Sequence, residues 1–409
     1  MKKWMISLVV PVLAVLMLTS AGQQQAKPAQ TQAPKKLTFG VALADNEWDV
    51  MRNVVFPMYT QKTGITIEGL QIENNDIESK VESLKGKGGI DIVAPDNMLL
   101  YGLVSKGLIK DLSSLESTIP PQIDKANYEF YKINGKMYFL PFRPNVKINF
   151  FNDTKFKEAG LTPPTNWDEL MNVAKTFYDR DKVGRIGMQA ILAAATTIEV
   201  FEYVKSAGGD PLVLNDDGSV KAFTFLQQLW PYVSQESLRA NFAIMNQDIA
   251  TDAMYYASNW PFAVNVIVQD GGKKEIQAHA GFSGPVKMSK VVGGNVLAIC
   301  ADTTNEAAAI DFCNFLASKE VQEILVSKLG WPAVRGDAYG TIADWQKPYF
   351  NAVMEALKVA EPRPILPYWA DVDKACCDAF KAIVIDGGDV KSNLDKYAAV
   401  IAAAKAKAQ

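Results

Sequence analysis

Short strand-like segments alternate with amphipathic helix-like segments along almost the whole of this 409-residue chain. Leu37 to Ala42 reads as a first strand, and the helix expected after it places Trp48, Met51 and Tyr59 on one face. This alternation is typical of an α/β fold with largely parallel sheets. Because one ordinary hydrophobic core does not serve a chain of this length, the sequence predicts about two domains.

Three local features add expectations about individual elements. Pro57 should kink the first helix, because proline disturbs the helical hydrogen-bond ladder. Thr165 with Asp168 three residues later resembles a capping box at the start of a helix. Leu212 to Phe223 resembles a hairpin around Asn215-Asp216-Asp217-Gly218, a run of turn-forming residues.

The N-terminus has the pattern of an export signal. Lys2 and Lys3 precede an apolar run from Trp4 to Leu18, which ends in small residues. Residues 1–22 are therefore expected to be a signal peptide, since a spanning helix needs about 20 apolar residues. Residues 23–36 are rich in Gln and contain Pro28 and Pro34, which predicts a flexible linker.

Charge and motifs exclude several functions. The net charge is −3 with no basic cluster, which argues against nucleic-acid binding. The chain has no phosphate loop, dinucleotide fingerprint or nucleophile elbow, and its four cysteines lack metal-ligand spacing. His279 is the single histidine, so no metal site, cofactor or histidine-dependent triad is expected. Carboxylate pairs such as Asp91 with Asp96, or Asp371 with Asp373, occur by chance in a chain with 45 acidic residues.

Three tryptophans stand beside turn residues. They are Trp260, before Pro261; Trp331, between Gly330 and Pro332; and Trp369, after Pro367 and Tyr368. A sugar presents apolar C–H faces that suit an aromatic ring, and a rim of hydroxyls that need partners once water is removed. Exposed rings with carboxylate, amide and guanidinium groups nearby would therefore form a sugar site, although most tryptophans are simply packed in the core.

The order of several segments resembles the extracellular solute-binding proteins of ABC importers, in the sugar-binding group (family 1) that includes maltose- and trehalose-binding proteins. The resemblance runs from about Leu37 to the C-terminus. The segments that carry it are Tyr59 to Ile67, Gly89 to Val93, Leu108 to Leu112, Asn134 to Phe142, Phe151 to Leu161, Pro163 to Leu170 and Gly293 to Ile299.

The resemblance implies a type II periplasmic-binding-protein fold, in which two α/β lobes joined by crossover hinge segments enclose a ligand cleft. The first lobe would comprise residues 37–144 plus 290–332, and the second residues 145–289 plus 333–409. The crossings are expected near 143–147, near 284–292 and after Trp331. The ligand would close the cleft by touching both lobes.

The resemblance also implies the residues of a substrate-binding site. Glu47 and Asp96 would accept hydrogen bonds from ligand hydroxyls, Trp260 would form a stacking platform, and Arg363 would donate. Arg143 and Asn145 would line the cleft floor. The segment that returns to the first lobe after the second crossing would add the last two candidates, Asn295 and Trp331.

Two departures from the family pattern affect these expectations. Gln23 stands where the family's lipoproteins carry the cysteine that receives a lipid, so the chain would be secreted across the cytoplasmic membrane and periplasmic or surface-associated without a lipid anchor. The crossing reads Phe142-Arg143-Pro144-Asn145, and its added arginine could indicate an anionic ligand.

The sequence thus predicts a monomeric, non-enzymatic subunit that captures a mono- to oligosaccharide and delivers it to permease subunits. A binding protein for a sugar phosphate or a polyol, a secreted carbohydrate-active enzyme and a structural surface protein remain the alternatives.

Overall fold

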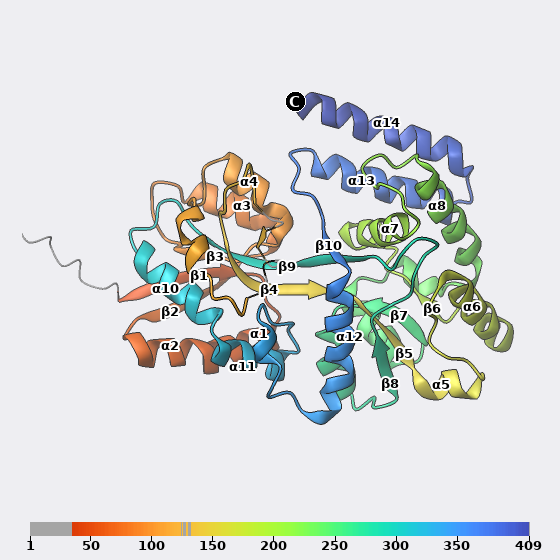
Figure 1. Ribbon diagram of the computed structural model, residues 1–409, viewed down its shortest axis with the longest axis horizontal. Coiled ribbons are helices and arrows are strands. Elements are labelled where there is room, and N and C mark those ends of the chain that lie inside the picture. Colours follow the sequence, from red (N-terminus) through yellow and green to blue (C-terminus); the bar gives the residue numbers. More distant parts are fainter. Residues whose placement is uncertain (1–34, 124, 126–127, 130–131, 409) are drawn as a thin grey trace, which may run out of the picture. The chain divides into compact units, whose positions relative to one another are not determined.

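The computed structural model describes residues 35–123, 125, 128–129 and 132–408 (Figure 1). Their strands form two sheets. The first sheet contains β1 (Lys36–Val41), β2 (Thr66–Gln71), β3 (Ile92–Val93), β4 (Leu140–Val146), β9 (Lys290–Ile299) and β10 (Ala360–Pro362). The second contains β5 (Ile148–Asn152), β6 (Ile186–Gly187), β7 (Tyr256–Asn259) and β8 (Ile276–His279).

Helices connect these strands in the alternation that the sequence predicts. The N-terminal helices are α1 (Asp45–Val50), α2 (Phe56–Thr63), α3 (Asn74–Ser83) and α4 (Leu100–Ser105). The middle of the chain forms α5 (Asp153–Glu158), α6 (Trp167–Asp181), α7 (Ala194–Ser206), α8 (Asp217–Leu229) and α9 (Phe242–Ala250). The later helices are α10 (Glu306–Leu316), α11 (Lys319–Leu329), α12 (Lys347–Lys358), α13 (Trp369–Phe380) and α14 (Val390–Ala408).

Strand direction follows the path of the chain. β1 pairs in parallel with β2 and β3, because helices return the chain to the same end of the sheet. β9 is antiparallel to β3 and β4, and β5 is antiparallel to β7 and β8. The α/β class is confirmed, but the expectation of largely parallel sheets is wrong for the strands around β9 and β5.

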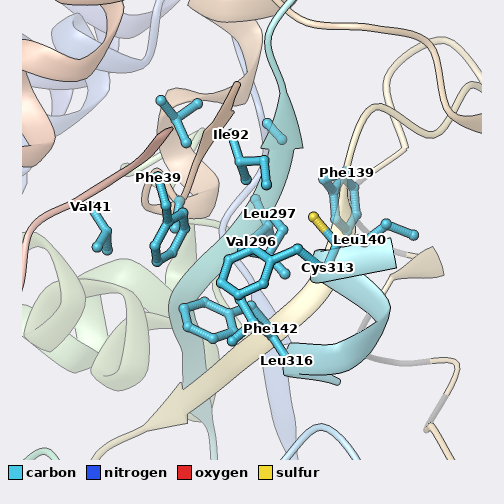
Figure 2. Close-up of a cluster of buried hydrophobic side chains, with 14 of the residues drawn as sticks. Phe39, Val41, Ile92, Phe139, Leu140, Phe142, Val296, Leu297, Cys313 and Leu316 are labelled. Carbon is cyan, nitrogen blue, oxygen red and sulfur yellow. The ribbon is translucent and has the colours of Figure 1, made fainter. Parts of the chain in front are cut away.

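Each sheet has its own hydrophobic core. In the first, Phe39 of β1 and Phe142 of β4 pack edge-to-face with ring centroids 6.3 Å apart (Figure 2). The ring centroid of Phe312, on α10, lies 5.8 Å from that of Phe39. This core draws residues from 37–142 and 296–334. A separate core around α6, α7, α8, α13 and α14 draws residues from 151–291 and 372–401. The two lobes therefore have distinct cores, each made from discontinuous parts of the chain.

Local sequence signals mispredict two elements, and the kink expected at Pro57 stays a prediction. A π-helical turn, Met51–Val55, separates α1 from α2 and ends two residues before Pro57. The predicted hairpin at 212–223 is wrong, because Asp216 accepts a hydrogen bond from the Ser219 amide and caps helix α8. The cap of α6 is Asn166, which accepts from the Glu169 amide, rather than Thr165.

The predicted signal peptide and nearly all of the predicted linker lie outside the described residues, and β1 begins at Lys36. Within the described ranges no helix combines the length and the apolar character that crossing a bilayer demands. The lobe boundaries at 144/145, 289/290 and 332/333 stay a prediction.

His279, at the end of β8, sits in a partly buried polar cluster of the second lobe. Its Nε2 lies 3.1 Å from the Tyr256 hydroxyl, and its ring packs edge-to-face against Phe151. Burial, with the charge of Lys290 nearby, lowers the pKa of His279 to about 4. Between about pH 4 and pH 6.5 the imidazole is therefore neutral in the folded protein but protonated in the unfolded chain.

This histidine should make stability depend on pH in a defined window. The stability that this lowered pKa contributes is fully present above pH 6.5 and is lost as the pH falls toward 4. In that pH range only the unfolded state binds the proton. We expect the free energy of unfolding to fall by about 2 kcal/mol more between pH 7 and pH 5 in the wild type than in His279→Gln. Urea unfolding at several pH values measures both curves, and parallel curves would contradict the assignment.

Candidate functional site

A cavity of about 790 Å³ lies between the two lobes, within the size range of small-molecule sites. Its first-lobe wall is formed by the segments that follow β1, β2 and β3, which are neighbours because the strands are parallel. Its second-lobe wall is formed by α9 and by residues 260–266, and its floor by β4 and β9. The lining residues are Ala42, Leu43, Ala44, Asn46, Glu47, Gln71, Glu73, Asn74, Asn75, Asp96, Arg143, Asn145, Phe242, Ala243, Asn246, Gln247, Ala250, Trp260, Phe262, Asn265, Val266, Gly294, Asn295 and Leu329.

Arg143, on β4, brings a positive charge to the cavity floor. Its Nη1 lies 3.2 Å from Glu47 Oε1, and its guanidinium lies 4.1 Å from the centroid of the Trp331 ring. Trp331 Nε1 donates to the same Glu47 oxygen at 2.7 Å. Burial lowers the pKa of Arg143, and the charges of Glu47 and Asp96 oppose that shift. The three side chains form one compensated unit, in which the arginine charge is already paired.

A second ion pair joins the first-lobe wall to a residue behind it. Arg363 Nη2 lies 3.3 Å from Asp96 Oδ1, which also accepts from the Met98 amide at 3.0 Å. Arg363 is only 6% exposed. The carboxylate that follows β3 is therefore engaged by a guanidinium from the segment after β10, so this pair also links distant parts of the chain.

Amide side chains supply most of the remaining polar groups. The lining includes Asn46, Gln71, Asn74, Asn75, Asn145, Asn246, Gln247, Asn265 and Asn295. The Oδ1 atoms of Asn145 and Asn265 are buried and accept no hydrogen bond. Buried polar groups usually find partners, but these two acceptors have none among the described residues and are closed off from solvent.

Aromatic rings lie on the second-lobe wall. Phe242, the first residue of α9, is 50% exposed and meets Phe262 edge-to-face, with centroids 5.8 Å apart. The Trp260 ring lies against Gly293 of β9, where an added Cβ would come within 3.1 Å of it. This wall thus brings aromatic side chains to the cavity beside three of its amides.

The structure brings six of the eight predicted site residues to the cavity wall. They are Glu47, Asp96, Arg143, Asn145, Trp260 and Asn295. Trp331, 1% exposed, and Arg363 lie behind the wall and contact it through Glu47, Arg143 and Asp96.

Sequence reasoning missed the α9 side of the cavity. Phe242 and Asn246 are one helical turn apart, so both face the cleft, and Phe262 joins them from the next segment. The one signal present was Asn241, a good helix cap placed directly before an aromatic residue.

Among the described residues, no three His, Cys, Asp or Glu side chains converge in a way that could hold a metal ion. The four cysteines are buried and unbonded, and burial raises the pKa of the Cys377 thiol to about 11.

Two α/β lobes with a cavity of ligand size between them are typical of solute-binding proteins. Residues 55–350 match the family described as bacterial extracellular solute-binding protein, and the chain belongs to that family.

Three relatives illustrate the similarity. The multiple sugar-binding protein of Streptococcus mutans is 44% identical over 45 residues, and the match spans 11% of this chain and 11% of that protein's length. The spermidine/putrescine-binding periplasmic protein 1 of Haemophilus influenzae is 23% identical over 277 residues, 67% of this chain and 69% of that protein. The maltose-bound MalE3 of T. maritima shares the fold, with a TM-score of 0.80 over 90% of this chain and 99% of that chain at 17% identity.

The Arg143 unit should make Glu47 important for stability. In Glu47→Gln the buried guanidinium loses its charge partner, and we expect the free energy of unfolding to fall by about 3 kcal/mol. Chemical unfolding measures the change. The control is Glu68→Gln, whose pair with Lys36 is exposed and should contribute less than about 1 kcal/mol. Equal effects of the two substitutions would show that Arg143 does not depend on Glu47.

Proposed function

We propose that the chain is the carbohydrate-binding subunit of an ABC importer, which captures a mono- to oligosaccharide outside the cytoplasmic membrane and delivers it to permease subunits. One observation carries this proposal: aromatic side chains and many amides line the same cavity, and the arginines at and behind its wall are already paired with carboxylates. Ring faces suit the C–H surface of a sugar, and amides both donate to and accept from its hydroxyls. The sugar-binding relatives add support.

The paired arginines argue against a phosphorylated or other anionic ligand. Arg143 is the basic side chain among the lining residues and Arg363 lies behind the wall, and each already faces a carboxylate. Binding a phosphate there would require a carboxylate to be displaced or repelled at close range, which costs energy in a poorly solvated site. Arg143, whose presence in the sequence suggested an anionic ligand, therefore pairs with a carboxylate of the cavity wall.

A polyamine is the second candidate, because of the similarity to a spermidine/putrescine-binding protein. A ligand with two or more ammonium groups needs carboxylates that are free to pair with it. Glu47 and Asp96 already contact guanidinium groups, which leaves Glu73 as the lining carboxylate without a cationic partner. A neutral ligand fits this charge balance better.

Binding without chemistry is part of the proposal. Asp91, half of one chance carboxylate pair, accepts from the Thr38 amide, the Thr303 hydroxyl and the Asn305 side chain. It thus ties β1 to the start of α10. Asp371 is exposed on α13 and does not line the cavity. We further propose that the protein acts as a monomer outside the cytoplasmic membrane.

A ligand screen by thermal shift tests the proposal. Maltose, trehalose, ribitol, glucose 6-phosphate and spermidine form one panel, and a ligand at 100 times its Kd should stabilise the protein by about 2.7 kcal/mol. We expect a neutral sugar to give the largest shift. A larger shift with spermidine or with glucose 6-phosphate would reject the neutral-sugar assignment.

Trp260→Ala should remove most of that ligand-induced shift, because the stacking surface is lost, while the ligand-free melting temperature changes little. The matched control is Trp345→Ala, which removes a 41% exposed tryptophan outside the cavity and should leave the shift intact. If Trp260→Ala instead lowers the ligand-free melting temperature strongly, this residue belongs to the core.

A further inference from the structure

Helix α7 of the second lobe carries three charged side chains, Glu199, Glu202 and Lys205, spaced three residues apart. This spacing places them along one face of the helix. Each of them pairs with a different segment that joins the two lobes. These segments are the β4–β5 junction, β9 and β10.

The first two pairs are buried. Lys147, directly after β4, places Nζ 2.7 Å from Glu199 Oε1, and the two side chains are 0% and 5% exposed. Lys290, the first residue of β9, places Nζ 3.6 Å from Glu202 Oε2. The other oxygen of Glu202 accepts from the Val291 amide at 3.1 Å, so it also holds the backbone of β9. Charges buried to this extent are tolerated only when paired, which fixes the position of each strand end against α7.

The third pair involves the short strand β10. Lys205 contacts Glu361 in the middle of β10, and Lys287 contacts the other oxygen of the same carboxylate. The Ser206 carbonyl, at the end of α7, accepts from the Val286 and Lys287 amides. Helix α7 therefore holds β10 and the approach to β9 as well as β4.

Residues of the proposed ligand site follow on the same segments at short distances along the chain. Asn145 precedes Lys147 by two residues, Asn295 follows Lys290 by five, and Arg363 follows Glu361 by two. On β9, between Lys290 and Asn295, lies Gly294, with φ of +112°, where an added Cβ would stand 2.0 Å from the Arg143 carbonyl oxygen. On the cleft side of the Lys290 pair, β9 thus adopts a backbone conformation that favours glycine.

We propose that Glu199, Glu202 and Lys205 are positioning residues: they fix the second-lobe ends of all three crossing segments to one helix, so that lobe rotation occurs only on the cleft side of these pairs. The side chains on β4, β9 and β10 then keep the same positions relative to the second-lobe wall, which includes Trp260, as the cleft opens and closes. This inference rests on the two-lobed solute-binding fold and does not depend on which solute is bound.

Distances between the lobes, measured in ligand-free protein, test the proposal independently of the ligand. Spin labels at Lys80→Cys and Lys221→Cys mark the two lobes at exposed positions, and the four native cysteines are buried. The main variant is Lys147→Met with Glu199→Met, which removes both charges without leaving one buried and unpaired. We expect a distance distribution about twofold broader than in the wild type, with an unchanged circular dichroism spectrum.

Two further variants make the test decisive. Lys374→Met with Asp378→Met removes an exposed pair on α13 of the same lobe and should leave the distribution unchanged. Lys205→Gln with Glu361→Gln removes the partly exposed pair and provides the measurement if the first variant does not fold. Broadening in either α7 variant but not in the α13 control supports the proposal. Distributions that match the control in every folded α7 variant would overturn it.

Discussion

The pairing of Arg143 with Glu47 constrains the whole cleft. A guanidinium that is poorly solvated needs a carboxylate partner, and here that partner comes from the segment after β1 while the arginine itself sits on β4. Trp331 completes the unit, since its indole donates to Glu47 and its ring covers the arginine. Three distant segments therefore meet at one charge-compensated point, and the surface that remains for a ligand is nearly neutral.

The asymmetry of the two walls follows from the fold. Parallel strands end at one edge of the first sheet, so the polar residues of their connecting segments gather on that side. The second wall uses a helix N-terminus and a turn, where Phe242 is 50% exposed and Phe262 lies partly buried beside it. A ligand with flat apolar faces and a hydroxyl rim can satisfy both walls at once.

The sequence allowed much of this to be predicted, for definable reasons. The alternation of strand-like and amphipathic helix-like segments predicts the α/β class correctly, and the first-lobe candidates Glu47 and Asp96 line the cavity, as the family resemblance implies. The hairpin prediction at 212–223 failed because Asp216 serves as a helix cap, a role that its turn-like neighbours conceal. Phe242 was missed because nothing in a local pattern distinguishes an exposed aromatic residue that faces a cleft from one that packs in a core.

The central claim is that paired charges leave a cleft suited to a neutral solute. Titration calorimetry of the best ligand from the screen, at about 20 mM and about 500 mM NaCl, tests it most directly, because salt screens interactions between a charged ligand and charged groups. The account predicts a Kd that changes less than about twofold between these conditions. A Kd that rises tenfold or more at high salt would mean that an unpaired charge in the cleft holds the ligand.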